Sequence, residues 1–306
     1  MSIRIGMGIA GFPFSSPSAF FRWVDLCEGS AIDSVWFSER LVSTQPTLEP
    51  MVAMAQLAGA TKRLKFGMNA IVLPLRDPLV LAKECATLDF LSGGRLLPAF
   101  GVGAEVAPEF RATGREPVGR GSRADEMLEI MVRLWSEGSV TYHGQHYHYE
   151  EASISPKPVQ QPLPVWIGGS SEAAVRRTAR FGTGWLAGLQ TPAQVKPVVQ
   201  AIRVAAAAAG RTIDEDHFGA GFSFRFGSWD EPLVERAGVR LSRIGAGLDA
   251  KAYMAVGGAG EIVARAREFV GAGVSKFVLS PVAASDEEWM DQTRRLIETV
   301  LPLVHA

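Results

Sequence analysis

The feature of this sequence that most constrains its fold is a regular alternation of two kinds of segment. Short apolar or β-branched runs recur eight times between longer segments whose apolar residues follow the period of a helix. Eight strands alternating with helices indicate a (β/α)8 TIM barrel, whose usual length of about 250 residues leaves room for insertions in a chain of 306. The predicted strands are Ile3–Ala10, Ser34–Phe37, Leu64–Ile71, Arg95–Gly101, Val165–Gly168, Gly184–Ala187, His217–Phe224 and Lys276–Ser280.

Two of the intervening segments show the helical period plainly. Within Arg123–Glu137, apolar residues fall at positions i, i+1, i+4, i+7 and i+8, and Gly260–Gly271 repeats this spacing. A doubly wound sheet also alternates strands with helices, but no G-x-G-x-x-G motif follows the first predicted strand. The pattern therefore favours the barrel.

Three segments interrupt the alternation and are interpreted as insertions in one barrel domain that covers residues 1–306. The second of them begins as a predicted hairpin with strands Val140–His143 and His146–Tyr149, followed by a proline-rich connector. The third contains one predicted helix. The insertions lie at about residues 104–121, 140–164 and 225–258.

Composition and charge exclude several classes of protein. Lys plus Arg (31) nearly balance Asp plus Glu (32), so there is no basic excess of the kind that a nucleic-acid-binding protein needs. No apolar stretch reaches the roughly 18 residues of a membrane span. The segment Met1–Ala10 lacks the pattern of a signal peptide, and Cys27 and Cys85 are too far apart for a disulfide scaffold. We therefore expect a cytoplasmic protein with no membrane or nucleic-acid partner.

Polar and small residues follow several predicted strands at their carboxyl ends, where TIM barrels carry their chemistry. Gly168-Gly169-Ser170-Ser171 precedes a predicted helix, so it is either a phosphate-binding helix N-terminus or a plain strand-to-helix turn. Glu39 and Arg40 are the candidate catalytic residues, and together they form either a ligand-binding pair or an exposed ion pair of little energetic value. Glu105 and Glu109 are interpreted as loop carboxylates exposed to solvent, and for Glu109 this is the preferred interpretation.

Three histidines lie within six residues, which is a pattern that metal sites can share. His143, His146 and His148 nevertheless belong to the predicted hairpin, where tyrosines alternate with them and no cysteine or paired carboxylate is near. We interpret them as a surface cluster and predict no metal site.

Taken together, the segments at the strand ends resemble a known family over nearly the whole chain and in the right order. The matching segments are Asp33–Leu41, Leu73–Pro78, Leu81–Lys83, Ala86–Asp89, Leu91–Leu96, Gly101–Gly103, Arg120–Glu126, Leu134–Trp135, Pro156–Gln160, Trp166–Gly169, Gly182–Trp185 and Ala272–Phe277. They are similar to those of the luciferase-like flavin and deazaflavin oxidoreductases, and most of all to the F420-dependent branch. Members that use FMN share most of these segments.

The resemblance implies a cofactor and a place for it. Coenzyme F420, with FMN as the alternative, would lie with its ring over Asn69 and Ala70, which relatives join by a cis peptide bond. Its phosphate would lie at Gly168, Gly169, Ser170 and Ser171, and Gly103 and Glu105 would line its tail or ring edge. The family is often dimeric, so the resemblance also implies a homodimer that acts on a small-molecule substrate.

One departure from the family bears on the reaction. Many F420-dependent members carry Asp-His where this chain has Glu39-Arg40, and their histidine takes a proton from an alcohol. Arginine has no accessible neutral form, so we expect Arg40 instead to stabilise negative charge on a substrate oxygen during reduction of a conjugated carbonyl. An FMN-dependent monooxygenase and a non-catalytic flavin-binding protein are the alternatives.

The far wall of the substrate site is expected to come from the loops Glu105–Gly121 and Arg225–Gly258, with Trp185 and Trp229. Neither loop carries a readable recognition motif. Because small-molecule sites are mostly apolar, an apolar or aromatic acceptor is the expected substrate.

Overall fold

A closed parallel barrel forms the centre of the computed structural model, which describes residues 3–245 and 247–304. Residues 1–2 of the predicted N-terminal segment, position 246 of the predicted third insertion and residues 305–306 lie outside this description. The strands follow the order β4-β6-β9-β10-β11-β13-β1-β2-β3-β5. Because β3 and β4 are consecutive in the chain, as are β5 and β6, the two ends of this order meet and the barrel closes.

All eight predicted strands are present in the barrel, and the TIM-barrel fold is confirmed. The third and fourth are each split in two, and one short strand that the sequence did not predict, β12, pairs with β11. The barrel strands are β1 (Arg4–Ile9), β2 (Ser34–Phe37), β3 (Lys65–Met68), β4 (Ile71–Val72), β5 (Leu96–Leu97), β6 (Ala99–Gly101), β9 (Trp166–Gly168), β10 (Gly184–Leu186), β11 (Phe218–Phe226), β12 (Ala255–Gly257) and β13 (Lys276–Pro281).

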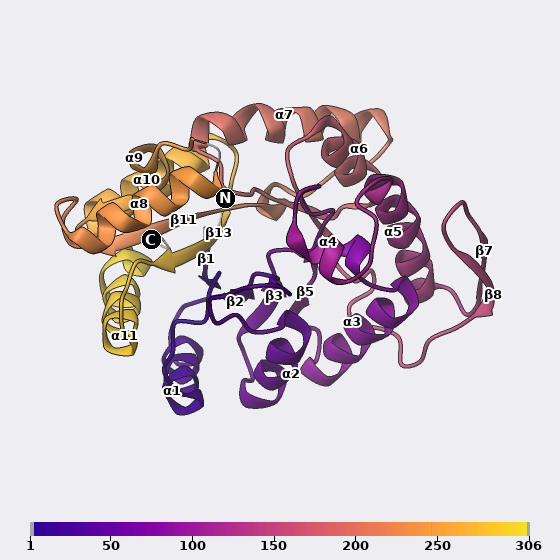
Figure 1. The fold of residues 1–306 in the computed structure, drawn as a ribbon, viewed down its shortest axis with the longest axis horizontal. Helices are drawn as coiled ribbons and strands as arrows, with labels where there is room; N and C mark the ends of the chain where they lie inside the picture. The colour runs from indigo at the N-terminus through magenta and orange to yellow at the C-terminus, as the bar shows by residue number, and fades with distance from the viewer. Residues whose placement is uncertain (1–2, 246, 305–306) are drawn as a thin grey trace.

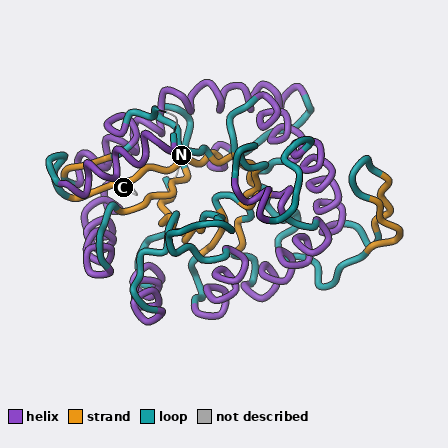
Figure 2. Tube along the Cα trace, in the orientation of Figure 1, coloured by secondary structure: helices purple, strands orange, loops and turns teal. Residues whose placement is uncertain are grey.

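Helices surround the strands on all sides (Figures 1 and 2). They are α1 (Pro17–Glu28), α2 (Pro50–Ala60), α3 (Pro78–Ser92), α4 (Pro108–Ala112), α5 (Arg120–Ser136), α6 (Glu172–Phe181), α7 (Pro192–Ala208), α8 (Pro232–Ile244), α9 (Ala250–Tyr253), α10 (Ala259–Gly271), α11 (Asp286–Arg295) and α12 (Leu301–Val304). Short helical turns at Leu73–Leu75 and Glu215–His217 and a π-helical stretch at Leu296–Val300 complete the chain.

Several helices begin where the sequence supplies a cap. Ser16, Asp77 and Ser285 each accept a hydrogen bond from a backbone N–H in the first turn of α1, α3 and α11. Proline occupies the first helical position of α1 and α3, where its missing N–H costs no hydrogen bond. These local signals fix the start of α1, α3 and α11.

Two tryptophans pack against each other in the barrel core. Trp36 of β2 and Trp166 of β9 are almost fully buried, and their rings meet edge to face at 6.2 Å. Glycine is needed beside them, since a Cβ on Gly67 would lie 2.8 Å from the Trp36 ring and one on Gly184 would lie 2.7 Å from the Trp166 ring. The interior is therefore a packed core, and polar chemistry is left to the ends of the strands.

The second insertion contains a hairpin that stands away from the barrel, at the right of Figure 2. Its strands are β7 (Val140–His143) and β8 (His148–Ala152). The first agrees with the prediction, but the second begins two residues later and ends three residues later than predicted. The cause is Glu126 of α5, whose carboxylate accepts hydrogen bonds from the backbone N–H groups of Gln145, His146 and Tyr147 and holds them as a turn.

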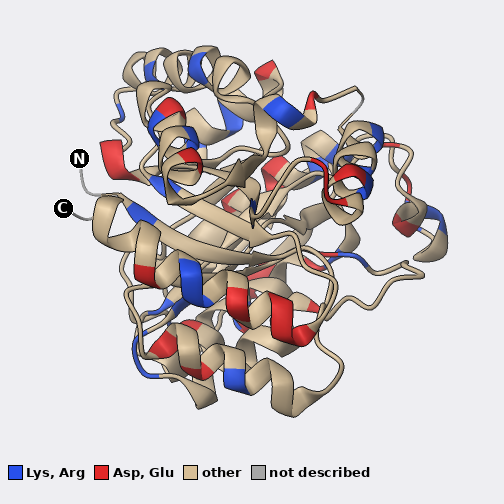
Figure 3. Cartoon of the chain, turned by 90° about the vertical axis from the view of Figure 1, so that its left-hand side faces the viewer, with Lys and Arg blue, Asp and Glu red and all other residues tan. Residues whose placement is uncertain are grey.

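Acidic and basic residues alternate along the helices in the view of Figure 3, and neither sign dominates there. Among the described residues, we find no helix that combines the length and the apolar character needed to cross a membrane.

Candidate functional site

Three small residues lie together where neighbouring strands end. The Asn69–Ala70 peptide bond, between β3 and β4, is cis, as the resemblance implied. A Cβ built on Gly101 at the end of β6, or on Gly168 at the end of β9, would lie 3.7 Å from the Ala70 Cβ. Because these three positions carry almost no side chain, they offer bare backbone on which a flat ligand can lie.

The segment Gly168–Ser171 leads from β9 into α6. Ser171 is the N-cap, and its side chain accepts a hydrogen bond from the Ala174 N–H, as expected for the predicted helix start. Gly169 has φ +104°, a conformation that favours glycine, and it is exposed together with Ser170 and Ser171. The first N–H groups of a helix have no partner within it, so this exposed end can bind an anion such as a phosphate.

Trp185 was predicted to line the substrate site, and this prediction was wrong. Its side chain is fully buried, and its indole N–H donates a 2.7 Å hydrogen bond to the Gly169 carbonyl. The ring thus packs in the hydrophobic core and offers no exposed surface to a substrate. Trp185 instead holds the backbone of the turn between β9 and α6 in place through this hydrogen bond.

Both carboxylate oxygens of Glu39 accept hydrogen bonds from other groups of the protein. Its side chain is 1% exposed, and one carboxylate oxygen accepts a 2.7 Å hydrogen bond from the Val72 N–H. The other oxygen pairs with Arg76, which also reaches Glu49 at 2.6 Å. Burial raises the pKa of the Glu39 carboxyl, while Arg76 and the Val72 N–H act to lower it. The arrangement ties the end of β2 to β4, next to the Asn69–Ala70 bond.

Arg40 is the next residue, and its position is different. Its side chain is 52% exposed, and the guanidinium lies 3.7 Å from a carboxylate oxygen of Glu109 on α4. That distance exceeds a hydrogen bond, so both groups keep hydrogen-bonding capacity for a ligand.

Glu109 was interpreted as a solvated carboxylate, and this was wrong. The residue is 4% exposed, and neither carboxylate oxygen has a hydrogen-bond partner among the described residues. The reason is that Phe110, which is 2% exposed, packs beside Gly103 and draws α4 down onto the strand ends. A Pro-Glu-Phe start of a short helix in the insertion is the signal that sequence reasoning passed over.

Gly103 and Glu105 begin the same insertion. Gly103 has φ +68°, and a Cβ there would lie 2.9 Å from Val72, so only glycine fits the turn. Glu105 is exposed and pairs with Arg120 at 3.1 Å, and Arg120 also donates to the Gly103 carbonyl. The structure thus places Gly103 beside β4, and Glu105 at the outer side of the insertion.

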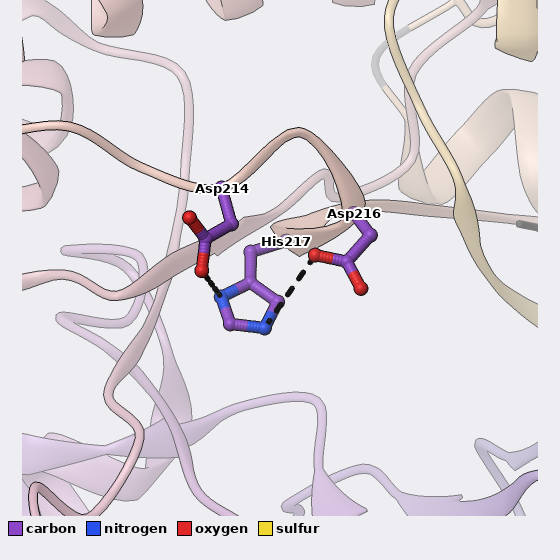
Figure 4. Close-up of side chains that lie close together, drawn as sticks. All are labelled: Asp214, Asp216 and His217. Carbon is purple, nitrogen blue, oxygen red and sulfur yellow. Dashed lines mark ion pairs between the residues drawn. The ribbon is translucent and has the colours of Figure 1, made fainter. Parts of the chain in front are cut away.

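Two clusters outside this site contain histidine. In the hairpin, His146 is hydrogen-bonded to Ser122 and His143 lies 3.3 Å from Glu150. A second cluster, Asp214, Asp216 and His217, brings potential metal ligands within 4.8 Å of one another at the amino end of β11 (Figure 4). His217 is 2.9 Å from the Thr183 carbonyl and Asp216 pairs with Arg4 at 3.2 Å, so protein contacts already occupy this cluster.

The chain is a TIM-barrel protein, and bare backbone, an exposed helix start and an Arg–Glu pair mark the carboxyl ends of its strands as the candidate ligand site. The family model described as Luciferase-like monooxygenase matches residues 6–301. The chain therefore belongs to the luciferase-like monooxygenase family, as the sequence resemblance indicated.

Individual relatives carry different activities in their names. The F420-dependent glucose-6-phosphate dehydrogenase of Kineococcus radiotolerans is 28% identical over 196 residues, which are 60% of this chain and 57% of that protein. The monooxygenase RslO1 from Streptomyces bottropensis superposes with a TM-score of 0.83 at 22% identity, over 98% of this chain and 99% of that one. An F420-dependent secondary alcohol dehydrogenase, solved with an F420-acetone adduct, gives the same TM-score and coverages at 19% identity. The chain spans little more than half the length of the curated relatives it matches.

Proposed function

We propose that this protein is an F420-dependent oxidoreductase that transfers hydride from the reduced deazaflavin to a small conjugated carbonyl compound. The observation that carries the proposal is the set of groups at one end of the barrel: bare backbone at Ala70, Gly101 and Gly168, an exposed helix start, and Arg40. The named F420-dependent relatives support the choice of cofactor.

The residues present fit such a cofactor. The ring would lie on Ala70, Gly101 and Gly168, since a Cβ added at either glycine would stand against Ala70 in the same space. The phosphate would be held at Gly169–Ser171 by backbone N–H groups at the start of α6, where the helix dipole favours negative charge. When bound, reduced F420 supplies one hydride, which is a proton and two electrons.

The protein's own contribution to the reaction is electrostatic. As the hydride reaches the β-carbon of the acceptor, the electron pair of the double bond moves toward the carbonyl oxygen, and Arg40 stabilises the resulting enolate oxygen by hydrogen bonding. A proton from water on the α-carbon completes the reduction. Glu39 is a positioning residue in this account, because its carboxylate is already used by Val72 and Arg76.

The first experiment is a parallel titration of the purified protein with F420, FMN and riboflavin, followed by fluorescence. We expect F420 to bind more tightly than FMN, and riboflavin to bind more weakly than FMN because it lacks the phosphate that the start of α6 would hold. A preference for FMN would replace the proposal with a flavin monooxygenase, which oxygen consumption with reduced FMN would identify. Binding without turnover of any conjugated carbonyl would favour a non-catalytic flavin-binding protein.

Replacing Arg40 with alanine should lower kcat for reduction of a conjugated carbonyl by roughly 100-fold, because one charged donor to a developing oxyanion is removed. The affinity for F420 should stay within a factor of about three, and the fold should be unchanged because the Arg40 side chain is half exposed. Stopped-flow absorbance of reduced F420 measures the hydride step, and Arg111→Ala, an exposed arginine on the same insertion, is the control. Unchanged turnover in Arg40→Ala would contradict the role.

A further inference from the structure

The Glu109 carboxylate is an unpartnered buried group at the proposed active site. Its side chain is 5% exposed, and neither oxygen accepts a hydrogen bond within the described part of the chain. Buried carboxylates in native proteins are almost always hydrogen-bonded, because losing water without gaining a donor is costly. We therefore expect the Glu109 carboxylate to accept a hydrogen bond from a bound ligand.

The surroundings of Glu109 restrict where that donor comes from. Phe110, the next residue of α4, packs beside Gly103 at the end of the fourth barrel strand. Arg40 comes from the other side, at the end of β2, and its guanidinium stops 3.7 Å short of the carboxylate. The Arg40 guanidinium is thus a hydrogen-bond donor and the Glu109 carboxylate an acceptor, and the two lie side by side without bonding to each other.

We propose that Arg40 and Glu109 bind the substrate together, and that the substrate is a conjugated carbonyl with a hydroxyl or N–H donor on the carbon next to the carbonyl. Arg40 donates to the carbonyl oxygen, and Glu109 accepts from the neighbouring donor. This specificity rests on the proposed function, in which Arg40 faces the oxygen that gains charge. A plain ketone or enone would leave the buried Glu109 carboxylate without a hydrogen bond, so the site discriminates against it.

The test compares two ligands, of which the second replaces the donor hydrogen with a methyl group, and Glu109→Leu separates the loss of the donor from the added volume. These are 2-hydroxycyclohex-2-en-1-one and its 2-methoxy ether, titrated into the F420-loaded protein with tryptophan fluorescence and thermal shift as readouts. We expect the hydroxy compound to bind at least roughly tenfold more tightly, which is the effect of one hydrogen bond to a charged group. Glu109→Leu should abolish this preference, and Glu109→Gln should keep part of it because the amide oxygen still accepts.

A second readout does not depend on turnover. Because Glu109→Leu removes a buried carboxylate whose oxygens have no hydrogen-bond partner among the described residues, it should raise the midpoint of thermal unfolding of the ligand-free protein, whereas a structural role would lower it. Glu116→Leu, on the same insertion but exposed, is the matched control and should change neither the midpoint nor the ligand preference.

The outcomes separate this inference from the proposed function. If F420 binds but the hydroxy compound and its ether bind equally, the role of Glu109 in specificity is wrong and the proposed function stands. If F420 does not bind, the proposed function fails, and the ligand preference measured on the unloaded protein still decides whether Arg40 and Glu109 form a recognition pair. A lowered unfolding midpoint in Glu109→Leu with an unchanged preference would overturn the inference.

Discussion

Replacing Gly168 with leucine should abolish cofactor binding and leave the barrel folded. A Cβ at this position meets only ordinary contacts, with the Phe100 carbonyl at 3.6 Å and Ala70 at 3.7 Å, and the backbone of Gly168 does not have a positive φ. The rest of a leucine side chain would extend over the bare backbone where the ring is proposed to lie. We expect the affinity for F420 to fall at least about 100-fold, close to the upper cost of overfilling a packed site.

Fluorescence titration measures the affinity, and circular dichroism with thermal unfolding reports whether the fold is kept. Gly260→Leu is the matched control, because Gly260 lies exposed on α10 and a Cβ there has no atom within 4 Å. The same insertion of volume should leave cofactor binding unchanged. Tight binding of F420 to folded Gly168→Leu would place the ring elsewhere and remove the main support for the proposed function.

The fold could be predicted from the sequence because its signal is repeated. Eight strands alternate with helices along the whole chain, so one misplaced boundary does not change the result. What the sequence did not show depends on local packing: β12 is only three residues long, and the break between β3 and β4 at Asn69–Ala70 interrupts a segment that the sequence predicts as one strand, Leu64–Ile71. Periodicity carries no information about such a break.

The site was predictable only where the signal is local. The Ser171 cap and the glycines before α6 are neighbours in sequence, so turn chemistry identifies them. Glu109 was missed because the burial of its carboxylate depends on how α4 packs against Gly103 and on Arg40, which lies 69 positions earlier in the sequence. Whether a loop carboxylate is solvated is a question of tertiary packing, which composition and spacing do not answer.

Replacing Arg76 with leucine should destabilise the protein more than any other single change at this end of the barrel. Arg76 is 17% exposed and neutralises Glu39, which is 1% exposed, while also reaching Glu49 at the start of α2. Without Arg76, the Glu39 carboxylate stays buried with one remaining hydrogen bond, from the Val72 N–H. Removing one partner of a buried pair costs about 3–5 kcal/mol, so a loss of this size in the free energy of unfolding is expected.

The pH dependence of that loss identifies its cause. Burial already raises the pKa of the Glu39 carboxyl, and losing Arg76 should raise that pKa further. A carboxyl whose pKa is higher in the folded protein than in the unfolded chain binds its proton preferentially in the folded state, so stability increases as the pH falls. The deficit of Arg76→Leu relative to the unmodified protein should therefore be smaller at about pH 5 than at about pH 8, as measured by urea unfolding.

A double variant separates charge from packing. Glu39→Gln keeps an oxygen for the Val72 N–H but removes the charge, so adding it to Arg76→Leu should recover much of the lost stability and its pH dependence. If the double variant also keeps F420 affinity and the hydride-transfer rate, Glu39 acts by holding β2 against β4. A large fall in kcat of the stable double variant, with unchanged cofactor affinity, would instead return Glu39 to the catalytic role that the sequence suggested.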